Sequence, residues 1–419
     1  MCPVEKVILT NTIQAQAEPE PCPSVDSGSN DAFAFWKLPE DYRDLLESGI
    51  EASRAAAEFY LLERYVPQRY RRPRASFRLY YALKPAVPSW LRHRARAINA
   101  RLMNQPSFPG WPYESVLLDL RSRWLRNALT KLDRQEMSHV SFWPYGMNCC
   151  VVLTHDVEGP VGIERMEAMA DIEERLGFKS AWNIPLGEYP VDWSKVQRLQ
   201  VRGFEFGAHG LRHDGRLFRS IREFRVLKQT LESKAREHGM RGFRSPSTLR
   251  RIEWLTSLDF DFDSTLADTD PYEPQPGGSC SIFPFFLSRT MVELPYTLPQ
   301  DHTLTNILRR DPLPIWIAKS QWIAERGGMI LTLTHPDYSG DPAGLARYSE
   351  LLKRLADLDS AWRALPSEVA SWWKRRASFQ LKDGRERRAS SQADRRVVVE
   401  RVTAESPLTK ASGVEGECS

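Results

Sequence analysis

The sequence predicts an α/β protein in which parallel strands alternate with helices to form a sheet or a barrel. Between residues 145 and 377, short β-branched or apolar runs alternate with segments of helical periodicity, as in βαβ units. Hydrophobic residues make up 42% of the 419 residues, which is enough to bury a sizeable core and excludes wholesale disorder. Four of the eight histidines follow predicted strands, and in such folds the catalytic groups gather at the carboxyl ends of the strands.

The secondary structure of this α/β region follows from its hydrophobic periodicity. Continuous apolar or β-branched runs predict strands at 149–154, 180–184, 204–207 and 329–334. Apolar residues at a spacing of three and four predict helices at 163–176, 193–202 and 221–237. Upstream, residues 51–64 keep the same helical spacing, so we expect a helical segment before the α/β region.

Composition divides the chain into four parts. Residues 1–30 are predicted to be a disordered leader, and residues 31–144 a basic helical N-terminal region. Residues 145–377 form the predicted α/β catalytic domain. Residues 378–419 are charged and rich in serine, and we expect a disordered tail there. The predicted chemistry therefore lies in a little over half of the chain.

Charge and cysteine content exclude several classes of protein. The 58 basic and 54 acidic residues give a net charge of +4, which excludes a chain built throughout as a polycation. The six cysteines are scattered and form neither a disulfide framework nor a CxxC metal site, which favours a reducing compartment. The sequence has no signal-peptide pattern and no apolar run of the roughly 18 residues that a transmembrane helix needs. We therefore expect a soluble, cytoplasmic protein.

A basic stretch stands out within the N-terminal region. Residues 64–101 contain eleven Lys or Arg and no Asp or Glu, with aromatic residues and prolines interleaved. One interpretation is a solvated helix face whose arginines pair with acids elsewhere in the fold. The other is a surface for an anionic partner, either phospholipid or a phosphorylated glycan carrier, which would place the protein peripherally at the inner membrane face. Nucleic acid is not expected, because no recognition motif accompanies the charge.

Acidic residues and histidines follow three of the predicted strands. The first strand runs into Asp156 and Glu158, the third into His209 and His213, and the last into His335. Two histidines four residues apart present both imidazoles on one face of a helical turn. With a carboxylate as third ligand, they suit a divalent metal that keeps an open position for water. Alone, the histidine pair also fits a solvated turn, but the acidic strand end that precedes it favours the metal site.

Five motifs in order resemble the polysaccharide deacetylases, the NodB homology domain of carbohydrate esterase family 4. They are Asp156-Val-Glu158, His209-Gly-Leu-Arg-His213, Arg244-Ser-Pro-Ser247, Asp261-Phe-Asp263-Ser-Thr and Leu331-Thr-Leu-Thr-His335. The resemblance covers roughly residues 145–373. It implies a distorted (β/α) barrel of the polysaccharide deacetylase type, here with an N-terminal helical extension, and a hydrolase acting on non-peptide carbon–nitrogen bonds.

The resemblance implies roles for the residues of the first three motifs. Asp156 is the expected catalytic base, and Arg244 is expected to hold it. Glu158, His209 and His213 are the expected ligands of one divalent metal ion, with zinc as the first candidate. Most members of the family carry Asp at the position of Glu158, whose extra methylene moves the carboxylate outward by one carbon–carbon bond.

The remaining motifs imply the groups around the substrate. The backbone N–H of Ser247 is expected to help bind the oxyanion, and His335 to act as general acid. Asp263 is expected to orient His335, although the residue is equally typical of a turn or a cap. Between the fourth and fifth motifs, Asp301 and His302 either contact substrate or belong to a Pro-rich connecting loop.

The function implied by the resemblance is metal-dependent removal of N-acetyl groups from an amino sugar of a glycan or glycolipid precursor, with release of acetate. Without a secretion signal, a substrate at the cytoplasmic membrane face is favoured over an external wall polymer, and the basic stretch would dock the enzyme there. Two alternatives stay open. One is a catalytically silent glycan-binding member, and the other a related metal-assisted hydrolase of another non-peptide amide bond.

Overall fold

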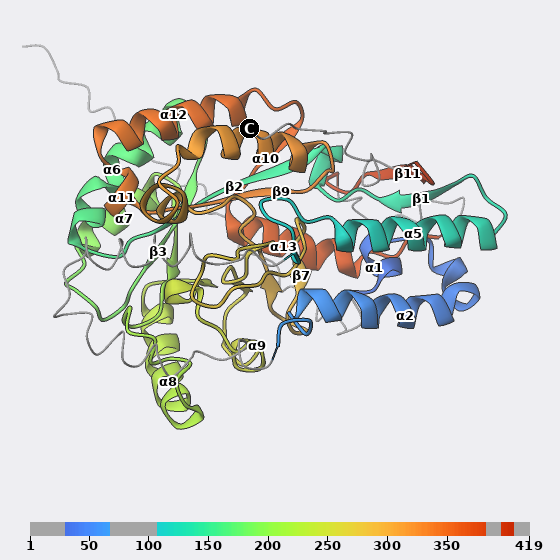
Figure 1. The fold of residues 1–419 in the computed structure, drawn as a ribbon, viewed down its shortest axis with the longest axis horizontal. Coiled ribbons are helices and arrows are strands. Elements are labelled where there is room, and N and C mark those ends of the chain that lie inside the picture. Colours follow the sequence, from blue (N-terminus) through green and yellow to red (C-terminus); the bar gives the residue numbers. More distant parts are fainter. Residues whose placement is uncertain (1–29, 68–106, 383–394, 406–419) are drawn as a thin grey trace, which may run out of the picture.

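The computed structural model describes residues 30–67, 107–382 and 395–405 of the chain (Figure 1). Its helices are α1 (Ala32–Trp36), α2 (Arg43–Leu61), α5 (Val116–Lys131), α6 (Pro160–Arg175), α7 (Trp193–Val201), α8 (Ile221–Glu237), α9 (Ile252–Leu255), α10 (Pro312–Ala324), α11 (Pro336–Ser339), α12 (Pro342–Ala356) and α13 (Pro366–Ser378). Its strands are β1 (Glu136–Val140), β2 (Cys149–Asp156), β3 (Ser180–Ile184), β4 (Glu205–Ala208), β5 (Gly242–Phe243), β6 (Phe262–Asp263), β7 (Phe285–Phe286), β8 (Val292–Glu293), β9 (Met329–Thr334), β10 (Ala361–Arg363) and β11 (Val399–Thr403).

Strands β2 to β10 form one sheet. β3, β4, β5, β6 and β8 follow β2 in spatial order, and β9 also pairs with β2, all in parallel. β10 pairs in parallel with the first residues of β2, and β7 adds an antiparallel edge to β8. Parallel neighbours need crossover connections, which α6, α7 and α8 supply between β2, β3, β4 and β5. The predicted α/β class is therefore confirmed.

The sheet closes into a distorted barrel. Beyond β8, Tyr296 forms a parallel bridge with Ala267, and the N–H groups of Thr297 and Leu298 both donate to the carbonyl of Leu331 in β9, at 3.1 Å. The segment that follows β8 therefore joins the continuation of β6 to β9. This closure brings the carboxyl ends of the parallel strands around one mouth of the barrel, and the predicted distorted (β/α) barrel is confirmed.

β2 and β9 are central strands whose side chains are all buried. Parallel strands are buried on both faces when helices cover the sheet, and Figure 1 shows α10 and α12 along the outside of these two strands. Continuous apolar runs predict such strands well. The strands predicted at 180–184 and 329–334 have the observed bounds, and β2 continues two residues beyond its prediction, to Asp156.

Helices α1, α2 and α5 of the N-terminal region pack against the barrel. Phe33, Leu61 and Leu125 are buried in the same hydrophobic core as the barrel strands. The basic stretch at 64–101 falls almost entirely within residues 68–106, outside the described part of the chain. Among the described residues, no helix combines the length and the apolar character that crossing a membrane requires.

A short antiparallel pair lies beside these helices. β11 pairs with β1 along its whole length, from Glu136 opposite Thr403 to Val140 opposite Val399. The prediction of disorder over 378–419 is therefore wrong for this strand, which gains its backbone partners from a segment more than 250 residues away. A three-residue apolar run in a charged segment gives little sign of such a partner. The predicted leader at 1–30 lies outside the described residues except for its last residue, as do 383–394 and 406–419.

Candidate active site

Three parallel strands deliver the motif residues to one end of the barrel. β2 ends at Asp156, with Glu158 two residues beyond it, β4 ends directly before His209, and β9 ends directly before His335. β2 lies between β3 and β9 in the sheet, and β4 follows β3, so these strand ends are near neighbours. The order of strands in the barrel thus assembles residues that are up to 179 positions apart in the sequence.

Glu158, His209 and His213 form a group of three potential metal ligands. One donor atom from each lies within 4.8 Å of the other two, and Oε1 of Glu158 is 2.8 Å from Nε2 of His213. Among the described residues, no other group of three or more His, Cys, Asp or Glu side chains is close enough together to hold a metal ion. Two imidazoles and a carboxylate are a ligand set that zinc accepts at catalytic sites, so the residues fit the predicted ion.

The tautomer of His209 favours its role as a ligand. Its Nδ1–H donates to the backbone carbonyl of Arg244 at 3.0 Å, which leaves the Nε2 lone pair available. The side chain is buried, and within the described structure its Nε2 has no hydrogen-bond partner. Because a buried polar nitrogen without a partner is costly, a metal ion at this position is the simplest means of satisfying it.

A loop, and not a helical turn, brings the two histidines together. The segment after β4 has no helical structure, and Gly210 adopts a left-handed backbone conformation with φ of +70°. A side chain at Gly210 would also approach Pro246 to 3.0 Å. The rings of His209 and His213 lie 5.8 Å apart between centroids. The helical-turn interpretation of their spacing is therefore wrong, although the predicted proximity is present.

Glu158 is held by residues that follow β9. Tyr338 donates its hydroxyl to Oε2 of Glu158 at 2.7 Å, and the backbone N–H of Glu158 donates to Asp337 at 2.9 Å. Burial alone would raise the pKa of Glu158, but the nearby charges of His213 and His335 hold it well below its usual value. Tyr338 was not predicted; its only signal in the sequence is its position three residues after His335.

Asp156 contacts Arg244, as predicted. Arg244 Nη1 donates to Oδ1 of Asp156 at 3.1 Å, and Asn183 Nδ2, at the end of β3, donates to the same oxygen at 2.8 Å. The other oxygen of Asp156 lies 3.8 Å from Nε2 of His209. Burial raises the pKa of Asp156, but His209 and Arg244 outweigh it and leave the pKa below its usual value, so the carboxylate is ionised. Sequence reasoning missed Asn183.

Arg244 is fixed in this position by hydrogen-bond acceptors at all three of its side-chain nitrogens. Its Nε and Nη2 donate to the backbone carbonyl and hydroxyl of Ser264, both at 2.6 Å, and Nη1 also donates to the hydroxyl of Thr154 at 2.8 Å. The side chain is fully buried. Because all three nitrogens of the guanidinium donate hydrogen bonds, Arg244 presents its positive charge to Asp156 without reorganisation.

His335 is oriented by Asp301, and not by Asp263. Nδ1 of His335 lies 2.7 Å from Oδ1 of Asp301, whereas Asp263 accepts a hydrogen bond from the Thr265 hydroxyl and pairs in register with Glu293. The prediction that Asp263 orients His335 is therefore wrong. The reason is the closure of the barrel. The segment after β8, which carries Asp301, lies directly against β9. Asp263 is in β6, which β8 and this segment separate from β9.

The alternative that Asp301 contacts substrate is also wrong. Its side chain is fully buried, and it accepts hydrogen bonds from the backbone N–H of His335 and from the Ser339 hydroxyl. Burial lowers the pKa of His335, but Asp301 and then Glu158 reverse this effect and raise it to about 10. His302 lies at the edge of this group, with its ring centroid 6.3 Å from that of His335.

Ser247 lies in a tight turn beside the metal-ligand group. Ser247 is in a left-handed conformation with φ of 52°, within the 3-10 turn Pro246–Thr248, and Pro246 packs against Gly210. A cavity of about 420 Å³ adjoins the same loop and is lined by Gly210, Leu211 and Arg212, among others. The turn therefore places Ser247 beside the loop that carries His209 and His213. The cavity lies between this loop and α8, where Leu227, Thr230 and Lys234 also line it.

Comparisons with known proteins concern the fold. No family model and no curated protein matches the sequence. The chain is similar to a putative polysaccharide deacetylase from Mycobacterium smegmatis, with 20% identity and a TM-score of 0.47 over 58% of this chain and 96% of that one. For a probable polysaccharide deacetylase from Pseudomonas aeruginosa PAO1 the identity is 14% and the TM-score 0.43, over 56% and 93% of the two chains. For Puue allantoinase the values are 13% and 0.44, over 56% and 92%.

In this chain the motif residues follow the strands of a distorted α/β barrel. Two of the solved structures to which the chain is similar are described as polysaccharide deacetylases, the family that its motifs resemble.

Proposed function

We propose that the protein is a metal-dependent deacetylase that hydrolyses the N-acetyl group of an amino sugar and releases acetate. The observation that carries the proposal is the convergence of two differently tuned groups on one ligand set. Asp156 is an ionised carboxylate 3.8 Å from His209, and His335 is a basic imidazole 4.0 Å from Glu158. A base and an acid on two sides of a metal site suit hydrolysis of an amide.

The metal would be held by Glu158, His209 and His213, and when bound it supplies a Lewis acid that polarises a carbonyl and acidifies water. Asp156 accepts the proton of the attacking water. Arg244 and Asn183 keep this carboxylate ionised and point its second oxygen toward the ligand group. The carboxylate of Asp156 is thus oriented in the folded protein before the reaction begins, so the reaction does not need to reorganise it.

His335 protonates the departing amine, because an amide nitrogen without a proton is a very poor leaving group. Asp301 accepts a hydrogen bond from the Nδ1–H of the ring, and Nε2 therefore faces Glu158 and the reacting atoms. The backbone N–H of Ser247 donates to the developing oxyanion. Backbone donors of this kind typically contribute about 3 kcal/mol to the stability of the transition state.

The proposed substrate is a glycan or glycolipid precursor at the cytoplasmic face of the membrane. Support comes from the five motifs, which resemble those of polysaccharide deacetylases and whose strand ends meet at one end of the barrel. The contribution of the basic stretch at 64–101 to docking on an anionic membrane is part of the same proposal. Co-sedimentation with anionic liposomes tests it, and unchanged sedimentation after neutralising the arginines would contradict it.

Metal binding tests the ligand set. We expect the full-length protein to bind about one zinc ion, and His209→Ala and Glu158→Gln to weaken binding by roughly 100-fold or more, since losing a ligand should cost more than losing an outer partner. His238→Ala is the matched control, because His238 stacks on Trp193 outside the ligand group. Equal zinc affinity of wild type and His209→Ala would refute the assigned site.

Acetate release from a panel of N-acetylated oligosaccharides tests the reaction. We expect Asp156→Asn to retain zinc and lose activity by about 100-fold or more, because a general base is removed. Full turnover by this variant would overturn the assignment. Metal binding without acetate release would favour the catalytically silent alternative. Hydrolysis of small cyclic amides, with no activity on acetylated sugars, would favour the other hydrolase.

A further inference from the structure

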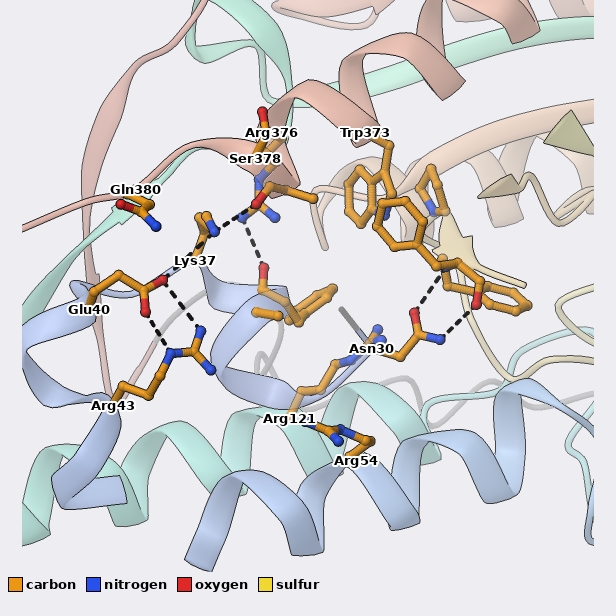
Figure 2. Close-up of a pocket in the computed structure, with 16 residues that line it drawn as sticks. Asn30, Lys37, Glu40, Arg43, Arg54, Arg121, Trp373, Arg376, Ser378 and Gln380 are labelled. Atoms are coloured by element: carbon orange, nitrogen blue, oxygen red, sulfur yellow. Dashed lines mark hydrogen bonds and ion pairs between the residues drawn. The ribbon is translucent and has the colours of Figure 1, made fainter. Parts of the chain in front are cut away.

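A second cavity lies between the N-terminal helices and the barrel, away from the catalytic group. It has a volume of about 480 Å³, and Figure 2 shows the side chains that line it. Helices α1, α2 and α5 form one side, and β7 and α13 form the other. None of its lining residues belongs to the five motifs, so this cavity plays no part in the proposed reaction.

The cavity is strongly cationic. Five basic side chains line it: Lys37, Arg43, Arg54, Arg121 and Arg376. Within the described residues, Glu40 is the one carboxylate among the lining side chains. Cations at this density in one concave site repel each other and concentrate a positive potential in the cavity, unless an anion is bound.

Three of the five cations are held by the protein. Arg376 donates to the backbone carbonyls of Ser141, Phe35 and Val140 at 2.8–2.9 Å, which fixes a charge without neutralising it. Lys37 donates to the carbonyl of Ala377 at 2.8 Å. Arg43 is different, because it pairs with Glu40 at 2.6 Å and is thereby neutralised.

Arg121 is the unexplained member of the group. Its side chain is 3% exposed, yet Nε and Nη1 of its guanidinium have no hydrogen-bond partner among the described residues. The guanidinium lies over the ring of Phe35 at 3.8 Å. Charged groups buried to this degree are normally paired and hydrogen-bonded, because removing them from water is costly.

Asp31, the acidic residue whose charge acts on Arg121, does not supply the missing hydrogen bonds. Asp31 is buried and accepts a hydrogen bond from the N–H of Ala34 at 2.8 Å, as the N-cap of α1. Its other oxygen is 3.9 Å from Arg54. Arg54 Nε also has no hydrogen-bond partner in the described structure. Two arginines on neighbouring helices, α2 and α5, therefore retain donors for a ligand.

We infer that this cavity is a second ligand site, which binds the phosphate group of a phosphorylated small molecule or lipid headgroup through Arg121 and Arg54. A phosphate matches the donors because guanidinium groups bind its oxygens in a planar, bidentate manner and because it carries more than one negative charge. The remainder of the ligand would lie against Phe285 and Phe286 of β7, which line the same cavity.

Binding of inorganic pyrophosphate to the full-length protein, measured by calorimetry, tests the inference. Arg121→Met keeps the apolar stem of the side chain and removes its charge, and we expect it to weaken binding by about 10-fold or more. Arg123→Met on the exposed face of the same helix is the matched control and should bind as wild type does. The failure of wild type to bind pyrophosphate, or equal binding by Arg121→Met, would overturn the site.

Two further arms separate this site from its alternatives. Pyrophosphate also binds metal ions, so the effect of Arg121→Met is measured again in a protein that carries His209→Ala. If Arg121→Met no longer weakens pyrophosphate binding in that background, the inference is contradicted. Glucosamine 6-phosphate and vesicles containing phosphatidic acid then distinguish a soluble ligand from a lipid headgroup. Binding of either the sugar phosphate or the vesicles supports the inference if Arg121→Met and Arg54→Gln both weaken it. Arg123→Met should leave the same binding unchanged.

Discussion

The carboxylate of Asp301 shows how a single buried residue can control a catalytic group. Its two oxygens accept hydrogen bonds from four donors, including Nδ1 of His335 and the backbone N–H of the same residue. The side chain therefore holds both the ring and the backbone of the proposed general acid. Each oxygen of Asp301 accepts from two donors. In an Asp301→Asn variant the NH2 group would therefore face hydrogen-bond donors in either orientation of the amide.

We expect Asp301→Asn to lower kcat by roughly 100-fold while KM changes little, because the residue acts through His335 and does not touch substrate. Asp263→Asn should cost much less, since Asp263 does not contact His335. Steady-state kinetics on an N-acetylated oligosaccharide measures both. A larger effect of the Asp263 variant would restore the pairing that the sequence predicts.

Tyr338 controls a proposed metal ligand in a similar way. Its hydroxyl donates to Oε2 of Glu158 and leaves Oε1 facing His213. We expect Tyr338→Phe to weaken zinc binding by about 10-fold, the usual effect of removing a partner of a ligand. Tyr65→Phe is the control, because Tyr65 donates its hydroxyl to the carbonyl of Gly278, outside the ligand group. Competition with a chromophoric chelator measures the affinities, and equal losses in both variants would argue against a specific effect.

At the scale of elements, Glu205 connects β4 to α13, and we expect it to make stability depend on pH. Glu205 at the start of β4 accepts a hydrogen bond from the N–H of Ser367 in the first turn of α13. Burial raises its pKa to about 7, more than Ser367 lowers it. The folded state therefore binds a proton that the unfolded chain releases near pH 4.5, so this residue makes stability fall as pH rises from about 4.5 to 7.

We expect Glu205→Gln to remove this fall, because the amide keeps an acceptor for Ser367 and has no charge. The difference in unfolding free energy between pH 5 and pH 8 should become smaller by about 1 to 3 kcal/mol. Urea unfolding at the two values measures it. Glu237→Gln at the exposed end of α8 should leave the pH dependence as it is. An identical pH dependence in wild type and Glu205→Gln would contradict the assignment.

At the scale of the whole molecule, a buried ion pair connects the N-terminal helices to the barrel. Glu63, just after α2, accepts two hydrogen bonds from Arg250, at 2.5 and 2.7 Å, and one from the N–H of Gly278 at 2.7 Å. Both side chains are less than 10% exposed. Together with the shared hydrophobic core, this pair indicates that the described N-terminal helices and the barrel unfold together.

We expect Glu63→Ala to destabilise the protein by about 3 to 5 kcal/mol, because it leaves Arg250 buried without its partner. Glu58→Ala on α2 should cost under about 1 kcal/mol, because its pair with Arg64 is solvent-exposed. Denaturant unfolding measures both changes. A separate early transition for the N-terminal helices in wild type would contradict the single cooperative unit.

The sequence predicts the elements of the barrel far better than the contacts between them. β3 and β9 have the predicted bounds because continuous apolar runs report burial on both faces. The proximity of Asp156 and Arg244 also follows from the motifs. The partner of His335 does not, because two aspartates were available and only the closure of the barrel selects Asp301. β11 shows the same limit, since its partner strand lies far away in the sequence.

By itself the sequence determined the α/β class and the strand ends that carry the motifs, because these depend on local periodicity, and the resemblance of the motifs supplied the proposed ligands. Only the tertiary structure decided the loop geometry of His209 and His213, the support of Glu158 by Tyr338 and the cationic cavity around Arg121. Each of these depends on how segments distant in the chain pack together. The physical reason is that burial and partner choice are properties of the closed barrel and its attached helices, and no single segment contains them.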